Sequence, residues 1–341
     1  MDTNDGSSPD TPWATLPHAV GEVRRLRGFN PPPEDTAALL LLPGTFYLEE
    51  TLSLTSAHLA YLTIRPYSGP VTISGGRPLD LAWTTEGKVR TGTFPGSCSE
   101  VFLDTWRLLP ARSPNTPWGP NMTAAQGPWH TITDLLEEGA DCKRVSNKFK
   151  QNCPASNKNG FVLDGEISAE WPDLEQTKVM VFHSWIAEYV RVKEVKEVGG
   201  RESPPLPGRQ EVRFQTPLSH APVGQWNKAG GWRFLVINNR AVLDQEGEVV
   251  CTEAGAEATV SYIPPADLQE ATPVIAALEV LIDISRTTSI SLTGLHFQHT
   301  SSGDKDGYPW GTQVSRSHPH SSRNPGSRQG ERSIGRDPAR L

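Results

Sequence analysis

The sequence of 341 residues lacks the apolar run of about 18 residues or more that a membrane-spanning helix needs. Its longest apolar stretch, 37–42, has the length of a buried strand. Methionine is scarce, with three residues, and long helical patterns are few, whereas glycine and proline are abundant, with 30 of each. These features favour a β-rich fold over a helical bundle, and they predict no membrane partner.

The sequence also lacks an excess of positive charge. It carries 32 Lys and Arg against 39 Asp and Glu, a formal net charge of −7. A surface that neutralises nucleic-acid phosphates needs a basic patch, so we expect no nucleic-acid partner. Residues 1–5 have neither the basic start nor the apolar core of a signal peptide. The cellular location is therefore open: the chain is cytosolic, or its leader is missing.

Cysteine is sparse, with four residues. Cys142 and Cys153 lie close together in a polar, Lys-rich stretch, where they form either a surface-loop disulfide or two free thiols. Cys98 and Cys251 have the sequence surroundings of small strand residues. Asn121 begins a glycosylation sequon, which matters only if the protein is secreted.

Residues 11–27 carry the one convincing helical pattern. Thr15 is the expected N-cap, Pro17 lies in the first turn, and Gly28 follows the last turn. Three arginines cluster near the C-terminal end, where the helix dipole favours cations. They are Arg24, Arg25 and Arg27. We interpret them as a solvated helix end rather than an anion-binding site.

Short alternating apolar segments follow the helix at intervals of roughly ten residues, each ending in turn residues. They cover 38–42, 51–54, 61–65 and 71–74. Leucine and β-branched residues recur at the inward positions. This rhythm predicts a solenoid in which each coil buries its apolar row against the next.

The rhythm changes between about 81 and 267, where strands become longer. Segments 179–185 and 189–195 form an expected hairpin, and the whole region predicts an antiparallel β-sandwich. A short helix or helical turn is expected over 134–139. The solenoid rhythm then returns at 274.

Four regions follow from these patterns. We expect a cap helix and first coils over 1–80, a sandwich insert over 81–270, resumed coils over 271–303, and a disordered or aberrant tail over 304–341. The tail has no aromatic residue after position 311 and is rich in Arg, Ser, Gly and Pro, so it buries too little apolar surface to fold.

Five stretches occur in the order found in one known family. They are 5–16, 42–48, 71–76, 101–115 and 289–300. The first, with its Pro-Trp-x-Thr-Leu motif, resembles the opening of secreted enzymes of the pectin-lyase-like superfamily. The third resembles a V-x-I-S-G-G coil, and the fourth resembles an R-A-R-x-P-N segment that opens an insert.

Taken in order, these motifs resemble the glycoside hydrolases in which a right-handed parallel β-helix is interrupted by an outer β-sandwich. The resemblance covers about 4–303. It implies a mainly β fold: an incomplete right-handed parallel β-helix, an antiparallel β-sandwich insert and one N-terminal capping helix. Two departures are structural. The turn at 244–249 lacks the family's Pro and Trp, and Thr105 stands where the family's hairpin has Gly.

The resemblance implies a glycosidase that acts on xylosides, fucosides and related glycosides of plant or algal polysaccharides. Such proteins are usually secreted, and we expect a full-length monomer with an oligo- or polysaccharide partner and without a cofactor or metal. Hydrolysis needs two carboxylates across the scissile bond. In the family these come from coils well after the insert, so we expect this chain to lack them and to be inactive alone.

Substitute catalytic residues are few. Asp283 points away from the apolar row of its coil, and Asp304 and Asp306 share one face if the chain is extended. The alternative for Asp283 is an ordinary solvated carboxylate, and Asp304 and Asp306 lie where the ordered pattern of the coils is already failing. His296 and His299 fall on opposite faces of a strand, so they do not bind one metal ion together.

Candidate sugar-binding residues lie in the predicted insert. Trp118, Trp129 and Trp226 occur in loops, where an indole ring stacks on sugar; packing in the core is the alternative. Arg112 and Asn115 are further candidates, against the alternative of a turn that their side chains stabilise.

Three functions remain on the sequence alone. The first is a glycoside hydrolase active in a longer form, and the second is a non-catalytic glycan-binding fragment or pseudoenzyme. The third is a polysaccharide lyase, which would need Ca²⁺ and a basic residue, although no acidic cluster for Ca²⁺ is evident. One or two resumed coils would also leave apolar strand edges open, which predicts aggregation.

Overall fold

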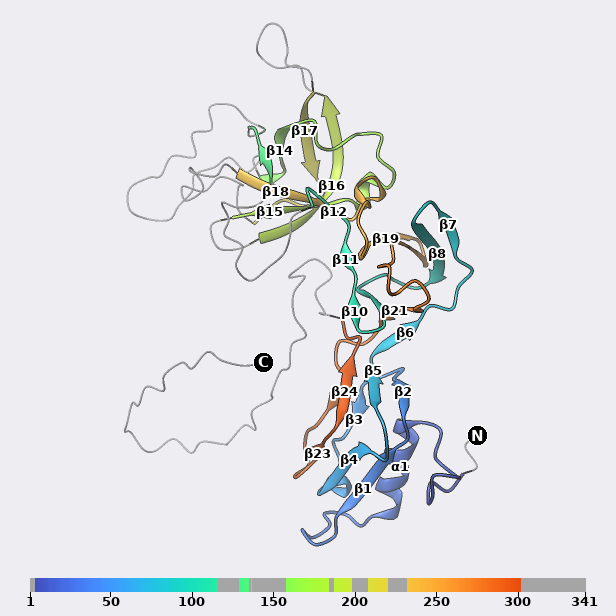
Figure 1. The fold of residues 1–341 in the computed structure, drawn as a ribbon. Coiled ribbons are helices and arrows are strands. Elements are labelled where there is room, and N and C mark those ends of the chain that lie inside the picture. Colours follow the sequence, from blue (N-terminus) through green and yellow to red (C-terminus); the bar gives the residue numbers. More distant parts are fainter. Residues whose placement is uncertain are drawn as a thin grey trace, which may run out of the picture.

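The computed structural model describes residues 4–115, 129–134, 136, 158–183, 187–197, 208–219 and 232–301. Within these ranges the protein is mainly β, as the sequence predicts, with the α-helix α1 (Leu16–Leu26) and the short 3-10 helices η1 (Ala57–Leu59), η3 (Leu174–Gln176) and η5 (Arg240–Val242). Parallel strands and α1 lie at one end of the molecule and antiparallel sheets at the other (Figure 1). None of the described helices has the length and hydropathy required to span a membrane.

The helix α1 (Leu16–Leu26) is shorter than the predicted 11–27 because a turn network precedes it. The Asp5 carboxylate accepts hydrogen bonds from the backbone of Ser7 (3.0 Å) and the hydroxyl of Thr11 (2.7 Å), and these bonds lower its pKa to about 2. Thr15 is the N-cap, as predicted, and its side chain accepts from the backbone N–H of His18.

Five short strands form the first part of the parallel region. They are β1 (Ala37–Leu41), β2 (Gly44–Tyr47), β3 (Leu52–Ser53), β4 (Leu62–Pro66) and β5 (Val71–Ser74). β4 pairs in parallel with β1, and β5 pairs in parallel with β2. The chain thus returns to lie beside its own earlier strands.

The chain then leaves and returns some 200 residues later. The returning strands are β22 (Ile282–Asp283), β23 (Ser291–Leu292) and β24 (Leu295–Gln298). They pair in parallel with β3, β4 and β5 respectively. β22 therefore occupies the position beside β3 that the outgoing chain left unfilled, and β23 and β24 continue the stack.

Side chains of alternate residues point inward and form one continuous apolar core. Leu62, Ile64, Val71 and Ile73 at its centre are each 0% exposed. The apolar face of α1 covers one end of this core with four buried side chains. These are Leu16, Ala19, Val20 and Val23. Burying a large aliphatic side chain contributes about 1.5–3 kcal/mol, so this contact accounts for the helix better than its intrinsic propensity does.

A small antiparallel sheet joins the parallel region to the insert. Its order is β10-β9-β21-β6, with bounds β10 (Trp106–Arg107), β9 (Val101–Leu103), β21 (Pro273–Ala276) and β6 (Gly76–Pro78). Outgoing β6 and returning β21 pair directly. The predicted boundaries at 80/81 and 270/271 fall just outside these two strands and stay predictions.

Two glycines are required where the outgoing and returning chains meet. A Cβ atom on Gly75 would lie 2.8 Å from Cδ2 of Leu281. A Cβ atom on Gly76 would lie 2.4 Å from Cγ1 of Val274 and 2.9 Å from Cβ of His299. Any larger residue would push the two chain segments apart, which explains the paired glycines of the sequence motif.

The insert contains a five-stranded sheet of order β11-β19-β20-β8-β7. Its strands are β11 (Leu109–Pro110), β19 (Glu248–Ala254), β20 (Glu257–Tyr262), β8 (Val89–Pro95) and β7 (Thr84–Glu86). Its core is built around Phe94, Val260 and Tyr262, and the indole of Trp83 meets the Tyr262 ring edge-on.

A seven-stranded antiparallel sheet forms the rest of the insert. Its strands are β12 (Arg112–Ser113), β13 (His130–Ile132), β14 (Gly160–Asp164), β15 (Lys178–Phe182), β16 (Ala187–Glu197), β17 (Arg209–Phe214) and β18 (Trp232–Ile237). The predicted hairpin is confirmed as β15 and β16. A bridge between Asp134 and Val162 brings the two ends of this sheet together around their own core. Most strands of the insert pair antiparallel, as predicted, although β11 and β19 pair in parallel, and the two sheets of the insert have separate cores.

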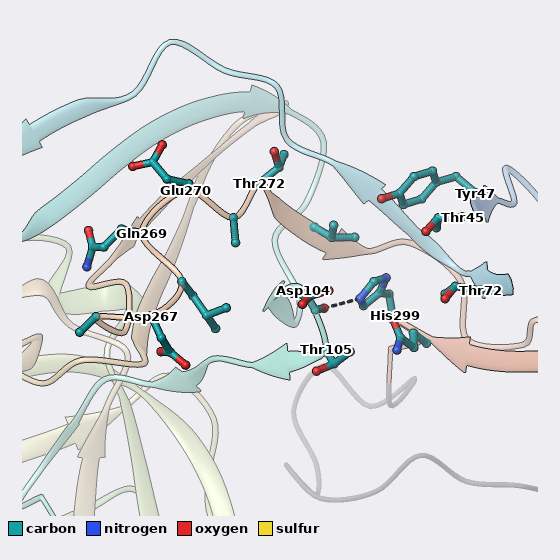
Figure 2. A pocket seen from close by; sticks show the side chains of 15 residues that line it. Thr45, Tyr47, Thr72, Asp104, Thr105, Asp267, Gln269, Glu270, Thr272 and His299 are labelled. Atoms are coloured by element: carbon teal, nitrogen blue, oxygen red, sulfur yellow. Dashed lines mark hydrogen bonds between the residues drawn. The ribbon is translucent and has the colours of Figure 1, made fainter. Parts of the chain in front are cut away.

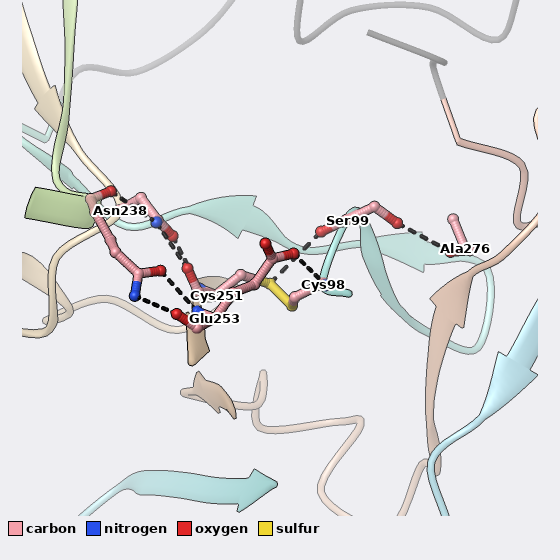
Figure 3. Close-up of a disulfide and its surroundings, with 7 residues drawn as sticks. Cys98, Ser99, Asn238, Cys251, Glu253 and Ala276 are labelled. Atoms are coloured by element: carbon pink, nitrogen blue, oxygen red, sulfur yellow. Dashed lines mark hydrogen bonds between the residues drawn. A yellow bond between two sulfur atoms is a disulfide. The ribbon is translucent and has the colours of Figure 1, made fainter. Parts of the chain in front are cut away.

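The sequence indicated only small strand residues at two of the cysteine positions. Cys98 and Cys251 form a disulfide with a Cα–Cα distance of 5.6 Å and a sequence separation of 153 (Figure 3). Cys98 lies in the connection between β8 and β9, and Cys251 lies in β19. The disulfide therefore links a segment near the start of the insert to a strand near its end. The predicted Cys142–Cys153 pair lies outside the described residues, as does most of the predicted 134–139 helix.

Two side-chain amides cover the free edge of β19 beside this disulfide. The Asn238 amide donates to the carbonyl of Cys251 and accepts from its N–H, both at 2.8 Å (Figure 3). The Gln176 amide makes the same pair of bonds with the backbone of Glu253, both at 2.6 Å. Each amide thus supplies the two bonds that a neighbouring strand would make.

Candidate functional site

A hollow of about 590 Å³ lies where the parallel region meets the insert (Figure 2). This volume falls within the range of small-ligand pockets. Fifteen residues from three parts of the chain line it. They are Thr45, Tyr47, Thr72, Asp104, Thr105, 266–272, Val274, Gln298 and His299. None of them was a sequence-predicted site residue, because the hollow exists only once these distant segments meet.

One wall is the outward face of the sheet β2-β5-β24. Because Phe46 and Ile73 point into the apolar core, their neighbours Thr45, Tyr47 and Thr72 point outward. The Tyr47 side chain is 44% exposed. Partial burial, and secondarily the nearby charge of Asp104, raise the pKa of its phenol, so Tyr47 is a neutral hydroxyl at physiological pH.

The opposite wall begins at the tight turn between β9 and β10. Asp104 has φ 53°, a left-handed conformation that Asp tolerates better than most residues. Only this position of the turn has a positive φ, so Thr105 is accommodated where the family resemblance led us to expect glycine. The turn presents the Asp104 carboxylate to the hollow.

His299 holds the two walls together. Its Nε2–H donates to the carbonyl oxygen of Asp104 at 2.8 Å (Figure 2). Its Nδ1 pairs with the hydroxyl of Ser74, also at 2.8 Å. The Ser74 oxygen in turn accepts from the N–H of Gly76 at 3.1 Å. The residue is 6% exposed and both ring nitrogens are occupied, so His299 positions the site and is not a free base.

The third wall is the loop 266–272, which Gln269 fixes from behind. The Gln269 amide donates to the carbonyls of Pro264 (3.1 Å) and Pro265 (3.2 Å) and accepts from Arg90 (3.1 Å). Asp267 and Glu270 belong to the same loop, line the hollow and are both solvent-exposed.

The lining combines unused hydrogen-bonding groups with negative charge. Several of its side chains make no hydrogen bond to another described residue. They are those of Thr45, Tyr47, Thr72, Asp104, Asp267, Glu270 and Gln298. Three of these carry carboxylates, and none of the described lining residues is Lys or Arg. The arrangement suits a ligand rich in hydroxyl groups and disfavours an anion.

A second polar cluster is enclosed within the insert. Glu248 is 3% exposed, and burial raises the pKa of its carboxyl to about 7. Its carboxylate accepts weakly from the backbone of Asp244 and Gln245, both at 3.3 Å. Arg112, itself 9% exposed, supplies a nearby positive charge. Glu248 has the pKa of a general acid but no route to a substrate.

Arg112 belongs to this cluster, and Asn115 lies beside it at the protein surface. The Asn115 amide donates to the carboxylate of Asp244 at 2.7 Å. Burial lowers the pKa of Arg112, against the opposing effect of Glu248. Their surroundings match the alternative of a side-chain-stabilised turn, and neither residue lines the hollow.

The other predicted site residues are not brought together. Asp283 is exposed on β22, beside Ser53 of β3, and does not line the hollow. Trp129 packs edge-on against Phe182, with the Arg233 guanidinium 5.3 Å from its ring centroid. The remaining predicted residues lie outside the described ranges. They are Asp304, Asp306, Trp118, Trp226 and Asn121.

One constellation that the sequence did not indicate resembles a Ser–His–acid arrangement. The Ser113 hydroxyl lies 3.0 Å from Nε2 of His130, and Nδ1 of His130 lies 3.9 Å from the Glu166 carboxylate. The second distance exceeds that of a hydrogen bond. Burial lowers the pKa of His130 and raises that of Glu166, so both are biased towards neutrality. The three residues therefore lack the ion pair that activates a serine nucleophile.

No protein-family model matches the sequence, and no curated protein matches it. Among solved structures, a protein described as a glycoside hydrolase is similar, with a TM-score of 0.62 and 18% sequence identity. The likeness covers 88% of this chain and 49% of that protein. At this identity it concerns the fold alone. The chain spans about half the length of that neighbour.

Proposed function

We propose that residues 4–301 form the N-terminal part of a carbohydrate-active protein of the glycoside hydrolase type. In this proposal the stacked parallel strands are coils of a right-handed parallel β-helix, and residues 81–270 are its β-sandwich insert. The substrates are glycosides of plant or algal polysaccharides. These residues supply substrate binding, and they do not by themselves complete the pair of carboxylates that hydrolysis requires.

One observation carries the proposal. After an excursion of some 200 residues, β22 pairs with β3 and the next two strands continue the same stack. An interrupted and resumed coil is an uncommon architecture, and it is the one that the sequence motifs resemble. The likeness to a solved glycoside hydrolase over 88% of this chain supports the same interpretation.

The positions of the carboxylates of Glu248 and Asp283 favour a role of residues 4–301 in sugar binding over a role in hydrolysis. A glycosidase places a protonated acid and an ionised carboxylate on either side of the substrate. Glu248 has the raised pKa of such an acid, but it is enclosed beside Arg112. Asp283 is accessible, but it lies apart from the polar hollow.

A non-catalytic glycan-binding protein is the second candidate, and the hollow supports it, because its lining suits hydroxyl-rich ligands. The described residues hold no group of three or more His, Cys, Asp or Glu suited to a metal ion, and no observation favours the lyase alternative. The Cys98–Cys251 disulfide supports an oxidising compartment such as the extracellular space.

The test is a binding and turnover assay on the purified 341-residue chain. An array of plant and algal oligosaccharides measures binding, and chromogenic xylosides and fucosides measure hydrolysis. We expect binding to at least one class of oligosaccharide without turnover above buffer. Absence of binding across the array would overturn the carbohydrate role. Turnover that Asp283→Asn abolishes would instead show that the hydrolytic chemistry lies within these residues.

A further inference from the structure

The charge of the hollow narrows the class of ligand. Asp104, Asp267 and Glu270 reach it from two separate segments of the insert, and its described lining contains no cationic side chain. All three residues are solvent-exposed, so their negative field over the hollow is strongest at low ionic strength. A uronic acid or sulfated sugar would meet this field as a like charge, whereas an uncharged sugar would meet only hydrogen-bond acceptors.

The wall formed by the sheet β2-β5-β24 supplies the hydrogen-bonding groups that an uncharged sugar needs. Thr45, Thr72 and Tyr47 present hydroxyl groups, and Gln298 adds an amide, from three neighbouring parallel strands. Hydroxyls and amides both donate and accept, so they match the alternating donors and acceptors around a sugar ring. The Tyr47 ring, 44% exposed at the edge of the hollow, offers an apolar face to the C–H groups of that ring.

The hollow is also fixed in shape before any ligand arrives. The ring of His299 links the parallel sheet to the Asp104 turn through two hydrogen bonds of 2.8 Å. Gln269 and Arg90 hold the loop 266–272 from its far side. A prearranged polar site loses little conformational entropy when it binds, which favours even a small ligand.

We propose that this hollow, formed by Tyr47 and its neighbours against Asp104, Asp267 and Glu270, is a subsite for uncharged sugar residues and discriminates against uronic acids. The assignment rests on the proposed carbohydrate role and narrows it. It selects neutral glycans over pectin-like, alginate-like or sulfated polymers.

The test compares two probes that share one backbone. Xylotetraose and its glucuronic-acid-substituted counterpart are titrated into the 341-residue chain at low ionic strength, with binding measured by calorimetry. We expect the uncharged probe to bind at least tenfold more tightly, and the difference to shrink as salt screens the carboxylates. Equal or tighter binding of the uronate probe would overturn the proposal.

Variants locate the binding. Tyr47→Ala should weaken xylotetraose binding about tenfold, the loss expected for one aromatic contact. Tyr67→Ala is the matched control, because Tyr67 is 52% exposed and lies outside the hollow. The double variant Asp267→Asn, Glu270→Gln should improve binding of the uronate probe. Thermal melting checks that each variant remains folded.

The outcomes separate this proposal from the wider one. If xylotetraose binds but Tyr47→Ala and the double variant leave both affinities unchanged, the hollow is not the subsite and the carbohydrate role stands. If neither probe nor any array sugar binds, the carbohydrate role itself fails. If only Tyr47→Ala changes the affinity, the site is correct and the charge discrimination is wrong.

Discussion

The parallel region and the insert differ in whether their edge strands are covered. In the insert, the bridge between Asp134 and Val162 joins the ends of one sheet, and the amides of Asn238 and Gln176 cover β19. In the parallel region, β22, β23 and β24 each pair on one side only within the described chain. One sheet of the insert is therefore closed on itself and β19 of the other sheet is covered, whereas the parallel stack ends on strands able to accept a further layer.

The disulfide is the strongest closure of the insert, and its removal should have the largest effect. The double variant Cys98→Ser, Cys251→Ser releases a loop with a sequence separation of 153 and should lower the free energy of unfolding by about 3–4 kcal/mol. The matched control, Cys142→Ser with Cys153→Ser, leaves this closure intact. Urea denaturation measures both, and equal stability of the two double variants would contradict the assignment.

The junction glycine should have the next largest effect. Gly76→Ala places a methyl group 2.4 Å from Cγ1 of Val274, so the outgoing and returning strands must separate, at a cost of about 2–3 kcal/mol. Gly28→Ala is the control, since nothing lies within 4 Å of its added Cβ. The same denaturation experiment compares them, and a tolerated Gly76→Ala would mean that the two strands are not in contact.

The buried Glu248 should make the insert sensitive to pH. Its pKa is about 7 in the folded protein, against 4.5 for an ordinary Glu. Its contribution to the free energy of unfolding is therefore greatest below pH 4.5 and is lost as the pH rises through 7. From about pH 5 to about pH 8 this group should cost about 2 kcal/mol of stability. Glu248→Gln should flatten that dependence, and denaturation at both pH values checks it. An unchanged slope would place Glu248 in contact with solvent.

The unpaired edge of the parallel stack at β24 should affect self-association of the protein more than its folding stability. Phe297 on β24 is 45% exposed, so Phe297→Ser should change stability by less than about 1 kcal/mol but reduce self-association at high protein concentration. Phe29→Ser, at a side chain 76% exposed near the end of α1, is the control. Sedimentation velocity measures the oligomers, and equal effects of both variants would indicate non-specific aggregation.

Local sequence signals predicted the local structure well. Thr15 as N-cap, the β15–β16 hairpin and the short parallel strands all follow from periodicity and capping preferences within a few residues. These features depend on near neighbours in the chain, which is why a single sequence reveals them.

The functional features depend on distant segments and were not predictable in the same way. Cys98 and Cys251 are ordinary strand-like residues until the fold places them 5.6 Å apart. The hollow combines Tyr47, Asp104 and Glu270, and no spacing rule links these positions. His299 was considered only as a metal ligand, and its bonds to Ser74 and Asp104 arise from the return of the chain.

The return of the chain completes both the interrupted stack and the hollow. The backbone N–H groups of Leu52 and Leu54 donate to the carbonyls of Leu281 and Asp283, both at 2.8 Å. Residue-resolved hydrogen exchange should therefore find these two amides as slow to exchange as those of β20 in the insert. Exchange of both at the rate of an unprotected chain, while the β20 amides stay protected, would show that the returning chain does not pair with β3.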